Sequence, residues 1–449
     1  MSEGTLGLAG ATSIALGGMI GGGIYAVLGV VTQLTGAATW AAFVVAGAVA
    51  LCVGYAYDRL NALTEDGGGS VTFVQSFTGR TTLAGMTGWT LLFGYIGSMA
   101  MYAVAFAEFT VAFDAVPATY AGASLRTLVA VLAIAGFVGV NLLGARTSGA
   151  TEKVLVSVKI LVLLAFGLAG VAYAAGLSVD PIALGKGSLT SVDPITAAGV
   201  SFVAFQGWQL LFYDQESMAD PVSTIRKAIA LSIPLAVAIY VLVAVATYNL
   251  APDALATHPH VALKDAAERV AGVVGLGRLG GVVIAFSALF STGSAINATL
   301  FSSSHFAKGM LSSDLLPDRM GDGDADGLPE RTVVVIGALT AAFAAYGSLE
   351  AVTNFASIAF VVAFAAVSYL AVRQRDREAV NPLPPLVGLV GTASFVPLVL
   401  AHLYRTDPNT FVLVCVLAVL VVAVELLYFE HEDIARNVER VEDGIQTKL

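Results

Sequence analysis

The sequence predicts an all-α polytopic membrane protein with about twelve transmembrane helices. Hydrophobic residues make up 57% of the 449 residues and charged residues only 12%, about half of the ~25% charged residues of an average soluble protein. Apolar stretches long enough to cross the roughly 30 Å hydrocarbon layer as helices recur from one end of the chain to the other. The composition therefore excludes an ordinary soluble globular protein.

Charge and cysteine content exclude several kinds of partner. The net charge of −10 argues against nucleic acid, whose phosphates attract basic surfaces. Cys52 and Cys415 lie far apart in apolar stretches, so neither a disulfide framework nor a zinc site is indicated. The first residues lack the basic start of a cleavable signal peptide, and the first apolar stretch is too long for one. We expect no cofactor, metal ion, nucleic acid or obligate protein partner, and a retained first span.

Twelve spans are expected where apolar runs are bounded by charged residues, Gly, Pro or Asp. In chain order they cover residues 6–32, 38–57, 82–112, 127–143, 154–176, 195–217, 229–250, 279–304, 332–346, 350–372, 384–402 and 409–429. Residues 1–430 are expected to form one transmembrane domain, followed by a short acidic cytoplasmic tail at 431–449.

The basic residues predict that both termini are cytoplasmic. With the N-terminus inside, fifteen of the 22 lysines and arginines fall in inside segments, six fall outside and one, Lys159, falls within a span. Lys and Arg are enriched in cytoplasmic loops of membrane proteins. This excess therefore supports a multi-pass protein of the cell membrane with an even number of spans.

Two connections are longer than simple turns and are candidates for gates. Residues 252–278 form an outside segment with an expected amphipathic helix over LKDAAERVAGVV, and residues 65–80 form an inside segment with alternating aromatic and polar residues. Long connections in compact proteins are often lids or binding loops.

Spans one and six are both expected to be interrupted. GGMIGGG at 17–23 places five glycines among seven residues, and SFVAFQGWQ at 201–209 places a polar Gln and a Gly within an aromatic run. In hydrocarbon a broken helix survives only where it is buried in protein or lines a cavity, and paired interruptions in two halves indicate a midplane binding site. Exposed helix ends favour a zwitterion or an amine. The alternative for span one is close helix packing, since Gly17 and Gly21 are four residues apart.

Four stretches carry a resemblance to a known family. IGGGIYAVLG at 20–29 and SFVAFQGWQLLFYDQESMADPVSTIRKAI at 201–229 resemble the first- and sixth-span signatures of the amino acid, polyamine and organocation (APC) transporter superfamily. YAYDRLNALTEDGGGSVTFVQSFTG at 55–79 and STGSAINATLFSSSHFAKGMLSSDLLP at 291–317 resemble its second- and eighth-span exits. The match covers spans one to ten in order and points to the amino acid permease branch.

The resemblance implies five plus five inverted spans, at about 6–176 and 195–372, with two peripheral helices at about 384–429. It also implies secondary active transport by alternating access. The substrate carboxylate is expected at an unwound first span, and its amino group at carbonyls of spans one and six, with aromatic side chains capping the site. The residues implied at the carboxylate are Gly21, Gly22 and Gly23. Those implied at the amino group are Ile20, Ser201, Phe202 and Phe205, and the implied aromatic caps are Phe205 again and Trp208.

Lys159 is the basic residue that falls within a span. It could snorkel to the cytoplasmic face, which Lys153 shows to be close. Burial disfavours the charged form of an ammonium, however, and lets a lysine exchange a proton. The resemblance implies that a lysine here takes the place of a sodium ion. Its implied partners are carbonyls near Gly17 and Ile20 and the hydroxyl of Ser291 or Ser294.

Other charged groups suggest a gate and an interface. Asp214 and Glu216 match acidic positions of the family, and an inner gate with Arg59, Arg226 or Lys227 is expected. Glu108, at the outer end of span three, could be a substrate-side acid, although an interfacial acid is the favoured interpretation.

The predicted function is proton-coupled transport of an amino acid across the cell membrane, with a small-molecule substrate, a proton and the lipid bilayer as partners. A polyamine or organic-cation transporter or exchanger of the same fold is the alternative within this class. A membrane substrate sensor that has lost transport is the alternative from another class. The spans hold no paired acids, histidine cluster or Ser/His arrangement, so an enzyme is not expected. His305 and Lys308 stand where the family usually has an arginine-containing acidic stretch, and Trp208 is bulkier than the usual Phe or Tyr.

Overall fold

The architecture is taken from a computed structural model of the chain. It describes residues 6–64, 68–113, 116–117, 119–120, 123–144, 149–176, 181–317, 320–321, 328–377, 380–424 and 426. The expected acidic tail at 431–449 lies outside the described residues.

Helices make up nearly all of the described chain. The long helices are α1 (Leu8–Thr35), α2 (Thr39–Leu63), α4 (Thr81–Val111), α5 (Leu125–Leu142), α6 (Gly149–Gly176), α8 (Pro221–Leu250), α11 (Gly277–Leu311), α12 (Glu330–Tyr346), α13 (Leu349–Arg373), α14 (Leu383–Thr406) and α15 (Pro408–Val424). Shorter helices are α3 (Ser70–Thr78), α7 (Asp193–Val200), α9 (Pro252–Thr257) and α10 (Ala262–Gly272). Short 3-10 turns are η1 (Gly36–Ala38), η2 (Lys186–Thr190), η3 (Ser201–Phe205), η4 (Trp208–Tyr213) and η5 (Gln215–Ser217), and β1 (Thr119–Tyr120) pairs with β2 (Ala123–Ser124).

The long helices are apolar enough to cross a membrane. In the described residues, nine helical segments have the length and composition of a span, and the first of these, Leu8–Leu63, holds both α1 and α2 around a turn at Gly36. Large apolar side chains such as Leu132, Leu161 and Phe290 are exposed on the outside of the bundle, where lipid would cover them. The all-helical membrane fold is confirmed, and the count of twelve spans stays a prediction.

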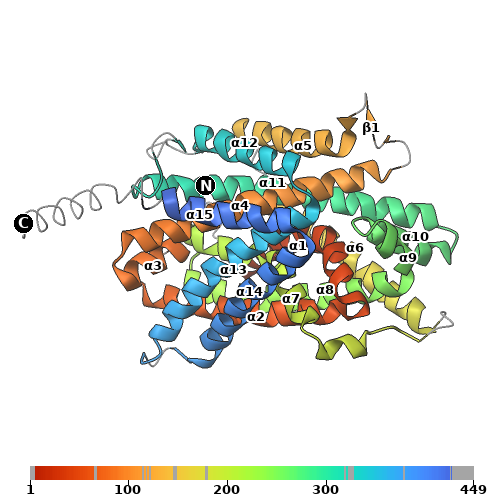
Figure 1. Ribbon diagram of the computed structural model, residues 1–449, viewed down its shortest axis with the longest axis horizontal. Helices are drawn as coiled ribbons and strands as arrows, with labels where there is room; N and C mark the ends of the chain where they lie inside the picture. Colours follow the sequence, from red (N-terminus) through yellow and green to blue (C-terminus); the bar gives the residue numbers. More distant parts are fainter. Residues whose placement is uncertain are drawn as a thin grey trace, which may run out of the picture.

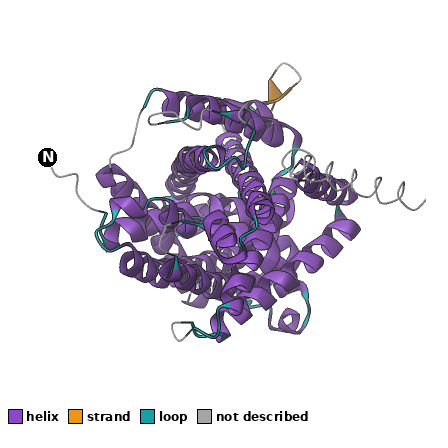
Figure 2. Cartoon of the chain, turned by 90° about the vertical axis from the view of Figure 1, so that its left-hand side faces the viewer, coloured by secondary structure: helices purple, strands orange, loops and turns teal. Residues whose placement is uncertain are grey.

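The packing of the helices is reciprocal between the two halves of the chain. α2 packs against α8, α4 against α11, and α5 against α12, while α4 and α11 each pack against both α5 and α12. In a five-plus-five inverted repeat, α2, α4 and α5 of the first half correspond to α8, α11 and α12 of the second half. α14 lies outside this set against α2, α7 and α13, and in Figure 2 several of the long helices are seen nearly end-on.

The two ends of the bundle are named here by the predicted orientation. The outer end carries α9 and α10, at the right of Figure 1, and the inner end carries α3, at the left. α10 lies within the segment where the amphipathic helix was expected, so that prediction is confirmed. The inner segment at 65–80 also contains a helix, α3, whose C-terminus is capped by Gly79 with a φ of 65°.

The predicted break in span one is wrong for this structure. α1 runs as one helix from Leu8 to Thr35 through all five glycines. The glycines instead permit close packing, because a Cβ at Gly22 would overlap the ring of Tyr102 and a Cβ at Gly21 would lie 2.7 Å from the Cβ of Ala295. Small residues of this kind let membrane helices approach closely, which was the alternative reading of the glycine run.

Span six is interrupted, as predicted. α7 ends at Val200, η3 follows to Phe205, and Gln206 is extended. Gly207 has a φ of 130°, which residues other than glycine rarely adopt. A glycine is required there, because residues with a Cβ are strained at positive φ. The chain then continues as η4 toward the inner end.

Candidate functional site

The interruption of span six lies directly against the glycine run of α1. A Cβ at Gly18 would lie 2.6 Å from the Cα of Gly207, and a Cβ at Gly207 would lie 2.9 Å from the backbone nitrogen of Met19. Two glycines facing each other therefore allow the two backbones to touch at the centre of the bundle. Side chains larger than hydrogen at either position would separate α1 from span six.

Side chains supply the hydrogen bonds that the interrupted backbone lacks. The amide of Gly207 donates to Gln209 Oε1 at 2.6 Å, and the amide of Val203 donates to the hydroxyl of Ser357 at 3.1 Å. Ser357 in turn donates to the carbonyl of Val200 at 2.5 Å. Because non-helical backbone at membrane depth needs such partners, these side chains explain how span six can be broken here.

The hydroxyl of Tyr240, on α8, joins α1 to span six. It lies 2.6 Å from the carbonyl oxygen of Met19 and 2.9 Å from that of Ala204. The single hydroxyl proton is shared between two carbonyls, and a Cβ at Gly23 would collide with the same oxygen. Two carbonyl oxygens from different spans thus converge on one buried point, which is an arrangement that attracts a positively charged group.

A buried amide pair extends this site toward α4. Gln206 and Gln209 are both almost fully buried, and Gln209 donates to Gln206 at 3.1 Å. Gln206 also donates to the hydroxyl of Tyr102, whose ring covers Gly22. Buried polar groups in a membrane span are costly and are commonly functional.

The remaining predicted substrate residues divide into two groups. Ile20 and Phe205 lie at the crossing, where the ring of Phe205 packs on Tyr240 at 5.3 Å. Phe202 packs against Phe364 and Phe395 of α13 and α14, and the hydroxyl of Ser201 donates to the carbonyl of Ala198 in the last turn of α7.

Trp208 is fully buried on the inner side of the crossing. Its ring lies 5.0 Å from that of Tyr57 and 5.4 Å from that of Phe364. Its Nε1 has no hydrogen-bond partner among the described residues. The indole therefore fills the space between span six, α2 and α13.

Lys159 is buried rather than snorkelling. Only 3% of the residue is exposed, and its Nζ donates to the hydroxyl of Ser294 at 2.7 Å. Ser294 is one of the two predicted hydroxyl partners. It donates in turn to the carbonyl of Ser291 at 3.0 Å. α6 also packs against α1, the helix that carries Gly17.

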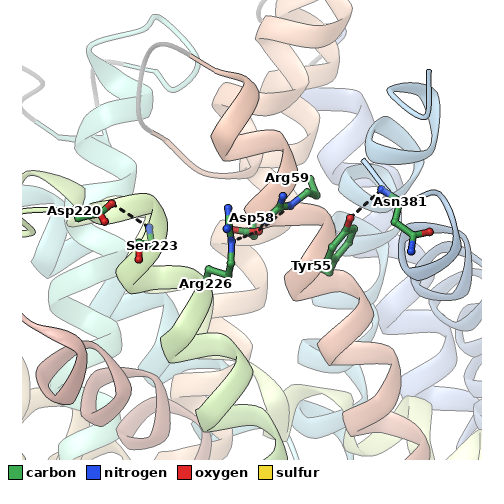
Figure 3. A network of polar contacts seen from close by, with 7 residues as sticks. All are labelled: Tyr55, Asp58, Arg59, Asp220, Ser223, Arg226 and Asn381. Atoms are coloured by element: carbon green, nitrogen blue, oxygen red, sulfur yellow. Dashed lines mark hydrogen bonds and ion pairs between the residues drawn. The ribbon is translucent and has the colours of Figure 1, made fainter. Parts of the chain in front are cut away.

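The ion-pair group at the inner end differs from the predicted one in its acid, while it includes the predicted Arg59 and Arg226. Asp58 of α2 is buried and lies between Arg59 and Arg226, as Figure 3 shows. Arg59 Nε donates to Asp58 at 2.9 Å, and Arg226 Nε of α8 donates to the same carboxylate at 3.0 and 3.2 Å. A buried carboxylate held by two guanidinium groups ties α2 to α8.

The predicted gate acids Asp214 and Glu216 do not take this place. Both are exposed, and Asp214 accepts a hydrogen bond from Ser217. The prediction is wrong because both of these side chains are exposed, whereas Asp58, one residue before Arg59, lies on the buried side of α2.

Two further hydrogen-bonded contacts join α2 to other segments at the same end of the bundle. Asn61 and Gln215 exchange hydrogen bonds at 3.1 and 2.9 Å, which joins α2 to the end of span six. The hydroxyl of Tyr55 accepts from the amide of Asn381 at 2.9 Å, which joins α2 to the start of α14 (Figure 3).

Several residues of the site were not predicted from the sequence. Gln209 and Asp58 were detectable in principle, because each is a polar residue within or at the end of an apolar span, as Gln206 of the predicted interruption is. Tyr102 and Tyr240 gave no such signal, since a tyrosine in a membrane helix commonly marks an interface instead.

The chain is similar to membrane transporters over almost its whole length. A family model described as amino acid permease matches residues 6–424. The inner membrane transport protein YbaT of Escherichia coli is 30% identical over 408 residues, which cover 89% of this chain and 90% of that protein. The branched-chain amino acid permease BcaP of Bacillus subtilis is 25% identical over 293 residues, covering 60% of this chain and 61% of that protein.

Solved structures share the fold. A manganese transporter from Eremococcus coleocola superposes with a TM-score of 0.61 at 15% identity, covering 96% of this chain and 95% of that chain. At this identity the likeness concerns the arrangement of the helices alone.

Proposed function

Because this chain belongs to the amino acid permease family, we propose that it carries amino acids across the cell membrane by alternating access, in symport with protons. The convergence of the Met19 and Ala204 carbonyls on one buried point is the observation that carries the proposal. It supports a substrate with an ammonium group, because two carbonyl oxygens directed at one point attract positive charge and that of Ala204 lies at the end of η3, where span six is interrupted.

The substrate is proposed to replace side chains that now occupy the site. Its ammonium group takes the position of the Tyr240 hydroxyl, between the carbonyls of Met19 and Ala204. Its carboxylate takes the amide of Gly207, which Gln209 now caps. Of the glycine face, Gly22 becomes accessible when Tyr102 moves away and Gly23 when the Tyr240 hydroxyl is displaced, while Gly21 stays packed against Ala295. Ile20, Phe205 and Trp208 line the remaining space, and Ser201 and Phe202 support it from behind.

Lys159 is proposed to carry the coupled proton. Its hydrogen bond to Ser294 links α6 to α11, and Ala295, the next residue of α11, lies against Gly21 of α1. Loss of the proton from Lys159 removes the charge in that bond, which weakens a contact roughly twice as strong as a neutral one. Binding or release of this proton therefore changes the strength of the contact between α6 and α11, and with it the packing of both helices against α1.

The inner gate is proposed to be the group formed by Asp58, Arg59 and Arg226, with both termini in the cytoplasm. It opens when α8 separates from α2. Alternating access requires such a closure at the inner end whenever the binding site is open to the outer side of the membrane.

Uptake into liposomes tests the proposal. Purified protein is reconstituted, and accumulation of each of the twenty amino acids and of putrescine is measured with an imposed pH gradient, with a sodium gradient at constant pH, and with neither. We expect accumulation of one or several amino acids only with the pH gradient. Accumulation of putrescine alone would indicate the polyamine alternative, and uptake driven by sodium alone would exclude proton coupling. Binding without any uptake would support the sensor.

A further inference from the structure

A cavity of about 160 Å³ lies at the outer end of the bundle. Its walls come from α4, α5, the connection between α9 and α10, and the turn between α12 and α13, and none of its described lining residues belongs to α1 or span six. The volume is below the roughly 300–1,000 Å³ of pockets for drug-sized ligands, so the cavity suits a compact ligand. It is separate from the site at the crossing.

The cavity holds one acid and one base. Glu108 Oε1 lies 3.0 Å from Arg126 Nη1, and 8% of the Glu108 side chain is exposed against 52% of the Arg126 side chain. The structure therefore buries the acid that was expected at the interface. A guanidinium carries five N–H donors, so Arg126 is able to hold a second carboxylate beside Glu108.

The start of α13 adds a second feature that attracts an anion. Ser348 and Leu349 line the cavity, and they are the N-cap and the first residue of this 25-residue helix. Backbone N–H groups at a helix N-terminus favour a negatively charged group. An anionic group is thus favoured near Arg126 and the start of α13, while a cationic group is favoured near Glu108.

His260 completes the lining with an unused polar atom. Its Nδ1 is buried and has no hydrogen-bond partner among the described residues. Burial and then the charge of Arg126 lower the pKa of His260, so the imidazole is neutral at neutral pH and can accept or donate one hydrogen bond. A buried nitrogen without a partner is costly, and His260 as a residue lines the cavity.

The cavity is linked to α1 through the residue before His260. The carbonyl of Pro259 is packed on Gly29, so that a Cβ at Gly29 would overlap it. The segment that carries His260 over the cavity therefore also covers the outer half of α1. A ligand that contacts His260 acts on a segment that must move if α1 is to open outward.

We propose that this cavity is an outer binding site for the zwitterionic head group of an α-amino acid, with the ammonium at Glu108 and the carboxylate at Arg126 and the start of α13. The inference rests on the proposed function, because it takes the transported amino acid as the ligand. The site binds the substrate at the outer end of the bundle before the α9–α10 segment moves away from α1.

Transport kinetics measured separately from the two faces test the proposal. The probe is the amino acid with the largest uptake in the twenty-amino-acid screen, and liposomes of known protein orientation give one KM for the outer face and one for the inner face. Glu108→Gln and Arg126→Gln are expected to raise the outer KM about tenfold, the cost of one charge-assisted contact, and to leave the inner KM unchanged. Lys264→Gln is the control, because Lys264 pairs with Glu268 on α10 outside the cavity lining.

A second variant keeps the test informative if the charge variants fold poorly. Ala344→Leu fills the cavity from its wall while Glu108 and Arg126 remain, and the same rise in the outer KM is expected. An unchanged outer KM in a folded variant of either kind overturns the outer site alone. Failure of the proposed function is distinguishable, because wild-type liposomes then accumulate no amino acid, which overturns both proposals.

Discussion

Lys159 Nζ lies 2.7 Å from the hydroxyl oxygen of Ser294, in a buried contact between α6 and α11. The following residue, Ala295, lies against Gly21 of α1. One charged group is thus two contacts away from the glycine face on which the proposed substrate site depends. This short connection gives a physical route by which a change of charge at Lys159 can alter the packing of α1.

Lys159→Arg tests whether the proton, rather than the charge alone, is needed. Arginine keeps the positive charge but does not release a proton in proteins. We expect accumulation driven by a pH gradient to be lost, while exchange of labelled for unlabelled substrate across the liposome membrane remains. Lys227→Arg, at an exposed position of α8, is the control and should keep both activities. Full accumulation by Lys159→Arg would exclude Lys159 as the proton carrier.

Gly22→Ala tests the close packing of α1. The added Cβ would overlap the ring of Tyr102, and overpacking of this kind costs about 1–3 kcal/mol of stability. We expect a lower thermal unfolding temperature in detergent and weaker transport. Gly136→Ala on α5 is the matched control, since no atom lies within 4 Å of its added Cβ. Equal unfolding temperatures for the two variants would contradict the packing shown here.

Tyr240→Phe tests the proposed ammonium position. The variant removes the hydroxyl shared by the Met19 and Ala204 carbonyls, and an unsatisfied buried polar group costs about 1–3 kcal/mol. We expect the substrate-free protein to unfold at a lower temperature, but the rise in this temperature on adding substrate to become larger, because substrate no longer competes with the hydroxyl. A tenfold loss of substrate affinity would show instead that the hydroxyl itself binds substrate.

Asp58→Asn tests the inner gate. Removing the carboxylate leaves Arg59 and Arg226 without their common partner, although water screens part of the loss because the Arg226 side chain is 48% exposed. We expect a cysteine placed at the buried position Phe212, in a protein lacking Cys52 and Cys415, to react several times faster with a water-soluble thiol reagent. Asp376→Asn is the control, because Asp376 is 93% exposed in its pair with Arg375. Equal labelling rates in both variants would exclude the gate.

The glycine run of α1 is a feature whose structure the sequence alone does not decide. Five glycines in a span are compatible with a broken helix and with close packing, and the residues themselves do not distinguish the two. The choice depends on what lies opposite. Tyr102, Ala295 and Gly207 come from three other segments, and their arrival beside α1 is decided by the packing of the whole bundle.

The helical membrane fold, the interruption at Gln206 and Gly207, and the presence of a charged side chain, Lys159, within a span could be read from the sequence by itself. Each is a local property, because apolar length, a glycine beside a buried amide, or a charge inside a span is visible within a few neighbouring residues. The tertiary structure alone decided that α1 stays helical, that Asp58 rather than Asp214 or Glu216 holds the inner arginines, and that Tyr240 joins α1 to span six. These are contacts between residues far apart in the chain, and the free energy of such a contact depends on which surfaces the fold brings together.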